Sequence, residues 1–316
     1  MILHIHLLGE IKLSEKVFRD TRTQIGILKS RGLVIKNASQ AKRIIRKTNY
    51  YNLINGYKDP FILTTTPFEK YIPGTHLEEL YALYEFDRKL RITTLEEILK
   101  VEKQVKTIIA YCFSKQHGHR DYLRFENFDT NGSSKFVQVS SLLSDLYKKI
   151  KLNEKDDAVQ HYVDSKNYLP LWVLVNAISM GDMSKFFSNM LQSERDEVAK
   201  RIKWGIREKQ LSTILYFLSS VRNRCAHDER LYCFHSHVSI GANNYHAYFH
   251  SKNKNGYFSV LIAFKMLLPR EEYTAYQRKV EGLLNELNRQ LKSIGISKIR
   301  AAMDLPSNWK KLSSLK

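Results

Sequence analysis

The sequence predicts an all-α protein, and three observations point to that class. Its 316 residues include only six prolines and thirteen glycines, the residues that most often interrupt helices. Hydrophobic residues make up 43% and aromatic residues 11% of the chain, which is enough to bury a substantial core. Apolar residues recur at helical spacing through long segments. We therefore expect helices to form nearly all of the fold.

Three regions follow from the positions of these segments. We expect an N-terminal helical segment at 1–72, a helical core at 73–268 with an insertion around 118–168, and a C-terminal helical segment at 269–316. In the core, Thr75 and Glu78 predict a capping box at the start of a long helix that ends at Gly118, with Thr93–Thr94 as a candidate break. A second break is predicted at the turn Gly181–Asp182. Helices are expected at 14–30, 39–49 and 135–152, and at 208–227, 258–268 and 270–291. Two more are expected on either side of the Gly181–Asp182 turn, the first of them starting at about residue 170.

The charge balance predicts a polyanionic partner. There are 51 Lys and Arg residues against 32 Asp and Glu residues, a formal net charge of +19. No segment approaches the roughly 18 consecutive apolar residues of a membrane span. The stretch "MILHIHLLGEIK" lacks the basic leader and the apolar run of a signal peptide. We therefore expect a cytoplasmic protein that binds nucleic acid and not a membrane.

The cysteines argue against a disulfide framework or a zinc site. Cys112, Cys225 and Cys233 are odd in number and contain no CxxC pair. We expect three buried thiols in a reducing compartment, with no metal and no cofactor.

An aromatic and basic stretch is a candidate RNA-binding segment. "TNYYNLINGYKDPF" (48–61) interleaves aromatic rings with cationic and amide side chains, a composition that suits single-stranded RNA. The alternative is an aromatic turn packed on the next helix. The expected RNA-binding residues are Lys42, Arg43, Arg46, Lys47, Tyr50, Tyr51, Tyr57 and Lys58.

The long helix carries charges in its apolar stripe. Asp87, Arg88, Arg91 and Glu102 share the stripe of Leu80, Ile98 and other apolar residues at about 100° per residue. A buried charge needs a partner, so these four residues are expected to support a site.

The stretch "VRNRCAHDER" (221–230), hereafter the motif, ends an apolar helix. Arg222 lies about 20° from Leu211 on the helical wheel, inside the apolar stripe, and should be at least half-buried against Asp87 or Glu102. Asn223 and His227 share one flank, and His227 lies about 140° around and roughly 7.5 Å along the axis from Arg222. The alternative is a helix that emerges into solvent with a structural histidine.

The motif's side chains suit metal-independent RNA cleavage. A histidine can take a proton from a ribose 2′-OH or give one to the leaving 5′-oxygen, and an arginine can stabilise the charged phosphorane. An asparagine can orient either group. One histidine can serve as the base or as the acid of this reaction, but not as both at once. A second copy of the chain would supply the other histidine. Arg230 and His235 repeat the spacing outside any helical period, and we discount them.

The chain resembles the Abi-like abortive-infection proteins of bacteria (the AbiD/AbiF type), within the HEPN superfamily. The resemblance rests on four segments in the expected order: "LKSRGLVIKNASQAKRIIRKTNYYNLINGYKDPF", "LYALYEFDRKLR", "LPLWVLVNAISMGDMSKFF" and "VRNRCAHDERL". It implies an HEPN-type helical bundle core, with an N-terminal helical extension and C-terminal helices. It also implies a homodimeric ribonuclease whose Arg222, Asn223 and His227 are catalytic. Family members act in phage defence, and some work with a small structured non-coding RNA.

One departure concerns control of the activity. HEPN toxins paired with antitoxins often read Arg-x4-His-x-Tyr, with the tyrosine modified by a partner enzyme, whereas this chain has Glu229 at that position and Tyr232 out of register. Two functions remain open: a toxin-like endoribonuclease of a defence system, and a non-catalytic RNA-binding protein that uses the HEPN core as a scaffold. A DNA-binding regulator is the weaker third alternative, since no helix-turn-helix is evident.

Overall fold

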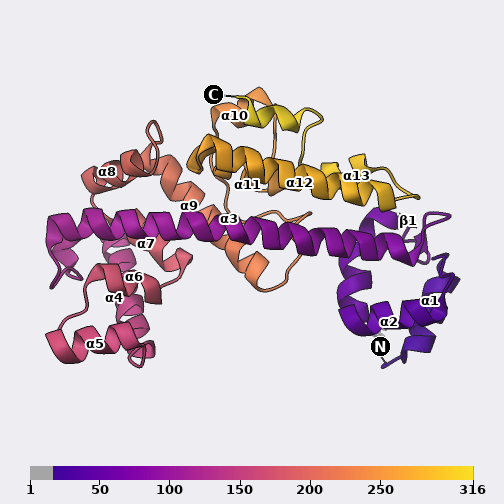
Figure 1. Cartoon of the computed structure of the whole chain (residues 1–316), viewed down its shortest axis with the longest axis horizontal. Coiled ribbons are helices and arrows are strands. Elements are labelled where there is room, and N and C mark those ends of the chain that lie inside the picture. Colours follow the sequence, from indigo (N-terminus) through magenta and orange to yellow (C-terminus); the bar gives the residue numbers. More distant parts are fainter. Residues whose placement is uncertain (1–16, 316) are drawn as a thin grey trace, which may run out of the picture. The chain divides into compact units, whose positions relative to one another are not determined.

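The computed structural model describes residues 17–315 and divides into two compact units, Met1–Tyr81 and Ala82–Lys316 (Figure 1). The predicted all-α class is confirmed, because helices dominate both units of the described chain. The first unit contains α1 (Thr21–Ser30), α2 (Ala38–Thr48), a π-helical segment (Tyr51–Asn55), a 3₁₀ turn (Asp59–Phe61), β1 (Ile62–Thr64) and β2 (Lys70–Tyr71). The unit boundary falls within α3 (Leu77–His117). The elements after α3 all lie in the second unit. They are a 3₁₀ turn (Phe125–Asn127), α4 (Ser133–Leu152), α5 (Asp157–Lys166), α6 (Leu171–Ala177), α7 (Met180–Asn189), α8 (Gln192–Ile202), α9 (Glu208–Ala226), α10 (Asn244–Tyr248), α11 (Tyr257–Leu267), α12 (Arg270–Gln290), α13 (Ile296–Ala302) and a 3₁₀ turn (Trp309–Ser313).

The first unit is a pair of short helices beside a small hairpin. Each helix starts at a side-chain cap: Asp20 accepts from the N–H of Thr23 for α1, and Asn37 accepts from the N–H of Gln40 for α2. β1 and β2 pair antiparallel, with Ile62 opposite Tyr71. The unit's core is apolar and includes Leu28, Ile44, Ile45, Leu53, Ile54 and Phe61.

Two predictions at helix starts are wrong. The helix expected from residue 14 begins at Thr21, because the Asp20 cap sets its start; residues 14–16 lie outside the described residues. Thr75 does not cap α3, since its hydroxyl donates to the carbonyl of Ile72 (2.7 Å). Glu79 instead accepts from the N–H of His76 (3.0 Å) and so satisfies a free donor at the start of the helix.

The long helix α3 continues through the candidate break at Thr93–Thr94. Thr94 is fully buried, and its hydroxyl lies 3.0 Å from the hydroxyl of Tyr276 on α12. Because a tertiary partner satisfies this hydroxyl, the threonine pair does not end the helix. All 41 residues of α3 therefore form one element.

Helices of the second unit pack along α3. α12 runs antiparallel to it, as shown by the ion pairs Lys89–Glu286 (2.7 Å) and Lys279–Glu96 (3.2 Å) (Figure 1). α11 is buried along nearly its whole length, and α9 packs mainly on α7. The C-terminal residues 269–315 thus belong to the same compact unit as the motif helix α9.

The middle of the chain is more helical than predicted. α5 and α8 were not expected, and α5 lies in the predicted insertion. The predicted turn at Gly181–Asp182 is wrong, because α7 runs through it. The helix break comes earlier, where the Ser179 side chain caps α7 and the Asp182 carboxylate accepts the N–H of Ser179 in return. No helix between residues 17 and 315 has the length and apolar character needed to cross a membrane.

Candidate functional site

The motif occupies the last turn of α9 and the turn that follows it. Leu211, Ile214, Leu218 and Val221 are completely buried, so packing fixes the rotation of α9 about its axis. The helix ends at Ala226, with His227 as its C-cap. Asp228 then adopts a left-handed conformation (φ 58°), and the N–H of Glu229 returns to the carbonyl of Arg224 (3.1 Å). This Schellman-type ending directs the chain back toward α3.

Arg222 is half-buried and faces α3, as its position in the apolar stripe predicts. Its Nε lies 3.9 Å from Oε2 of Glu102, an ion pair without a hydrogen bond, and 32% of its side chain is exposed. Of the two predicted partners the structure selects Glu102, not Asp87. Glu102 also pairs with Lys106 (2.8 Å), so its charge is shared between two cations. The guanidinium is thus held on one side and accessible on the other.

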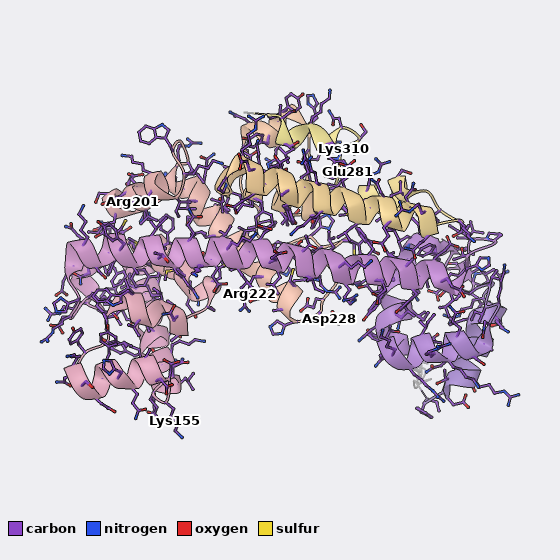
Figure 2. The ribbon with its side chains drawn as sticks, in the orientation of Figure 1. Lys155, Arg201, Arg222, Asp228, Glu281 and Lys310 are labelled. Carbon is purple, nitrogen blue, oxygen red and sulfur yellow. The ribbon has the colours of Figure 1, made fainter. Side chains whose placement is uncertain are left out.

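A second set of contacts holds the turn after α9. Arg91, 3% exposed, donates to Asp87 (2.6 Å) and to Asp228, which lies beside the same edge of α3 as Arg222 in Figure 2. Asp87 is completely buried and also accepts the backbone N–H groups of Leu231 (3.1 Å) and Tyr232 (2.7 Å). A buried carboxylate is stable here because each of these donors favours its charged form. Asp87 and Arg91 therefore fix the end of the motif.

Arg88 has a different environment from the one predicted. Its guanidinium donates to Glu85 on the same helix (2.8 Å), and 42% of its side chain is exposed. Asp87 and Arg91 occupy the buried stripe, while Arg88 lies about 100° around α3 from Asp87. Arg88 therefore lies outside the buried stripe, and its supporting role at the motif stays a prediction.

Asn223 and His227 are the accessible side chains of the motif. Both are exposed, and within residues 17–315 neither side chain has a hydrogen-bond or ion-pair partner. The N–H of His227 donates to the carbonyl of Asn223 (2.9 Å), so the backbone between them is helical. The spacing predicted for Arg222 and His227 on a regular helix therefore applies. One chain presents one arginine and one imidazole that do not converge on a single point.

A groove of about 780 Å³ adjoins Arg222, on the side of α3 that faces α6. Glu102, the partner of Arg222, lines this groove. Two aromatic side chains line it, with Tyr111 56% and Trp172 46% exposed, and the Arg201 guanidinium lies 4.9 Å from the ring centre of Tyr111. Lysines 103, 106 and 115 supply positive charge. Exposed rings beside ammonium groups suit an unpaired nucleic-acid strand.

The predicted RNA-binding residues of the first unit divide into two groups. Lys42, Arg43, Arg46 and Lys47 lie on the solvent side of α2, opposite its buried residues, and the ring of Tyr51 is 64% exposed. Tyr50 is half-buried, and burial raises its pKa. Tyr57 is 3% exposed, so as a base-stacking residue it is a wrong prediction. Lys58 is 19% exposed and paired with Glu69, and the alternative of a packed aromatic turn fits this half of the stretch.

The cysteines, which are among the side chains that could bind a metal, differ in burial. None of the three cysteines forms a disulfide with another described residue; Cys112 and Cys225 are buried and Cys233 is half-buried. Burial raises the pKa of the Cys225 thiol, on the buried side of the motif, to about 12. Within the described part of the chain, no group of three or more His, Cys, Asp or Glu side chains has the geometry of a metal site.

Sequence reasoning did not identify Asp228, although it completes the Arg91–Asp87 cluster. A signal was present, because an aspartate directly after a helix tolerates the left-handed conformation that a C-cap turn requires. Arg224 was also missed. Its guanidinium bonds to the carbonyl of Arg230 (3.1 Å), pairs with Glu229 (3.1 Å) and lies 4.4 Å from the ring centre of Phe234. Glu229, the residue in place of the modifiable tyrosine, thus helps to close the turn.

Comparison with models of known protein families places the chain in one of them. The family model described as Abi-like protein matches residues 43–233. This segment runs from α2 to just past the turn after α9 that Asp87 and Arg91 contact. No curated protein and no solved structure matches the chain.

Proposed function

Since the chain belongs to the Abi-like protein family, we propose that it is a toxin-like, metal-independent endoribonuclease of a bacterial anti-phage abortive-infection system. Family membership indicates the role in abortive infection, and the motif suggests RNA cleavage as the way this role is carried out. The proposed site of action is the cytoplasm. The catalytic residues are Arg222, Asn223 and His227, with Asp87, Arg91 and Glu102 as positioning residues.

The observation that carries the proposal is the different burial of Arg222 and His227, the arginine and the imidazole of the predicted catalytic set. Arg222 is half-buried beside Glu102, at an ion-pair distance of 3.9 Å, which favours one orientation of its guanidinium before a substrate arrives. His227 is exposed, so its imidazole is open to a substrate and to water, as a group that transfers protons to and from RNA must be. A purely structural histidine would be packed or bonded, and His227 has no such partner among the described side chains.

The proposed reaction is attack of a ribose 2′-OH on the adjacent phosphorus. A P–O2′ bond forms and the P–O5′ bond breaks, which leaves a 2′,3′-cyclic phosphate and a 5′-OH. One imidazole accepts the proton of the 2′-OH and a protonated imidazole supplies the proton to the 5′-oxygen, so the protons balance. Arg222 stabilises the negative charge that develops on the non-bridging phosphate oxygens.

Two imidazoles require two copies of the motif, so we include a homodimer in the proposal. The surface of α3 beside the motif supports it, because Ile92 is 57% and Leu99 is 48% exposed. These residues are seven apart and therefore share one stripe of α3, near the residues that hold the motif. A second copy packed on this stripe would bring two motifs together and cover the exposed apolar side chains.

The proposed nucleic-acid partners are the substrate strand and a small structured non-coding RNA. The groove beside Arg222 offers Tyr111 and Trp172 for stacking, and the open face of α2 offers four cations for phosphates. A net charge of +19 supports binding to a large polyanion.

Purified wild-type protein, His227→Ala and His235→Ala would be compared for cleavage of single-stranded RNA in excess EDTA. His235 is the matched control: it is the discounted histidine beyond the motif, and it pairs with Asp304 (2.9 Å). We expect 2′,3′-cyclic phosphate ends from wild type and His235→Ala, and none from His227→Ala, with equal RNA binding by all three. Equal cleavage by His227→Ala would refute the catalytic assignment. Co-purifying RNA would be sequenced from each preparation.

One observation favours a second candidate, a non-catalytic RNA-binding protein that uses the helical core as a scaffold. Catalytic imidazoles are usually oriented by a neighbouring group, and no such group contacts His227 within residues 17–315. A defined co-purifying RNA with identical ends in wild type and His227→Ala would select this function.

A further inference from the structure

A second pocket, of about 620 Å³, lies at the other end of the motif helix. It is formed by the turn between α8 and α9, the end of α11 and the first residue of α12. Arg207, the N-cap of α9, stands 15 residues before Arg222, roughly 22 Å along the helix. The pocket is therefore separate from the motif and from the groove beside it, and its volume suits a small-molecule ligand.

Every charged side chain that lines this cationic pocket is positive. The four are Lys203, Arg207, Lys265 and Arg270, and no aspartate or glutamate of the described chain lines the pocket. Like charges repel one another when no counter-charge separates them, and this repulsion costs stability. Four cations around one cavity are typical of a site that is completed by an anion.

Among the described residues, only neutral groups hold the two lysines. Lys203 donates to the carbonyls of Leu268 (2.9 Å) and Lys265 (3.2 Å), and the Lys265 ammonium donates to the carbonyl of Ser313 (3.2 Å). An ammonium has three donors, so each lysine keeps donor capacity that no other described residue uses. Burial lowers the pKa of both lysines, and Lys203 and Arg270 lower the pKa of Lys265 further.

Two long helices add to the positive potential. α9 starts after Arg207 and α12 starts at Arg270, and both residues line the pocket. Free backbone N–H groups and the helix dipole make such starts favourable for phosphate. Arg207 and Arg270 are exposed, and neither guanidinium has a partner among the described residues.

An aromatic ring stands at the same place. Trp204 is 87% exposed in the turn between α8 and α9, where Gly205 has a positive φ (88°) that other residues rarely adopt. Tyr245, half-buried, lines the pocket as well. An indole so exposed gains nothing from the core, and it offers a face on which a nucleobase can stack.

We propose that the cationic pocket binds a nucleoside polyphosphate, with its phosphates among Lys203, Arg207, Lys265 and Arg270 and its base on Trp204. Four lining cations match the three to four negative charges that such a ligand carries. This site goes beyond the proposed nuclease and does not depend on it, since none of its residues belongs to the motif.

Calorimetric titration of the full-length protein with ATP and with GTP tests the proposal. We expect at least one of them to bind with a dissociation constant below about 100 µM, and to quench tryptophan fluorescence. Arg207→Gln combined with Arg270→Gln should weaken binding at least tenfold, because each loses a charge-assisted contact. Lys155→Gln combined with Arg289→Gln removes the same charge at exposed sites outside the pocket and should leave binding unchanged.

Trp204→Ala, at an exposed turn, should abolish the quench and weaken nucleotide binding without affecting inorganic triphosphate. His227→Ala should bind nucleotide like wild type even if it cleaves no RNA, which separates this proposal from the nuclease. Absence of binding at millimolar nucleotide would overturn the proposal. Equal losses in the two double variants would also overturn it, as would binding of 5′-phosphorylated RNA at the pocket when free nucleotides do not bind.

Discussion

Arg91 on α3 pairs with Asp228, the residue directly after the motif histidine, and at the same time with the buried Asp87. The turn that carries His227 is thus bound to a helix more than 100 residues away in sequence. The long helix both forms the core and determines where the motif ends.

Asp87→Asn should destabilise the protein by about 3–5 kcal/mol, because it removes the buried carboxylate that faces the buried Arg91 and leaves the arginine its pair with the exposed Asp228. It also weakens the acceptor for the N–H groups of Leu231 and Tyr232. Chemical denaturation monitored by circular dichroism measures the change. Arg88→Ala removes an exposed pair on the same helix and should cost no more than about 1 kcal/mol. Similar costs for the two variants would contradict the role of Asp87.

Asp228 combines a left-handed backbone with an ion pair, and two substitutions separate these effects. Asp228→Gly and Asp228→Ala both remove the pair to Arg91, but only glycine adopts φ 58° without strain. The glycine variant should therefore be the more stable of the two by about 1 kcal/mol. Urea midpoints measure the difference, and an alanine variant of equal or greater stability would show that the turn changes conformation.

Arg222→Ala should cost only about 1 kcal/mol, much less than Asp87→Asn. Its ion pair is long, a third of the side chain is exposed, and Glu102 retains Lys106 as a partner. RNA cleavage should nevertheless fall by two or more orders of magnitude if the guanidinium stabilises the transition state. A melting temperature that falls as far as in Asp87→Asn would mean that the loss of cleavage reflects unfolding.

His246 predicts a pH dependence of stability. It is 2% exposed, and burial, with a smaller effect from Lys254, lowers its pKa to about 4. Between that value and the usual value of about 6.5, the unfolded chain binds a proton that the folded chain does not. The neutral, buried imidazole therefore adds about 3 kcal/mol to the free energy of unfolding. This stabilisation is fully present above pH 6.5 and is lost as the pH falls through 4. His246→Gln should flatten this part of the stability profile, and an unchanged slope would exclude the residue as its source.

Replacement of Lys42, Arg43, Arg46 and Lys47 by glutamine should weaken RNA binding and reduce its salt dependence. If all four contact single-stranded RNA, the slope of log K against log salt should fall by about 3. Titrations from low to moderate salt measure it. A slope equal to that of wild type would assign the RNA-binding surface to other cations of the chain.

Much of the fold could be predicted from local pattern. The spans of α4, α9, α11 and α12 agree closely with the periodicity of their sequences. The burial of Arg222 was predictable because Leu211 and its neighbours define the stripe of α9 on which the arginine lies. Each of these predictions depends on residues within a few turns of one helix.

The errors arise where distant residues decide the structure. Thr94 stays helical because Tyr276 satisfies its hydroxyl, and no local pattern contains that information. Asp87 and Glu102 were equivalent partners for Arg222 on the helical wheel, and only packing showed that Asp87 binds the turn after α9. Tyr57 has the composition of a stacking residue but lies in the core of its unit. Side-chain type predicted what these groups can bind, and tertiary contacts determined which partner each one has.

The continuity of α3 limits the lengths of insertion that the chain can tolerate. Arg91 and Glu102 stand 11 residues apart, about three full turns, and so face the motif from the same side. One residue added between them would rotate Glu102 by about 100° and carry it away from Arg222, although no contact residue had changed. Added lengths near 7 or 11 residues would restore the phase but lengthen the span by roughly 10 Å or more, beyond the reach of the motif. This interval of α3 should therefore keep a constant length wherever both ion pairs are retained.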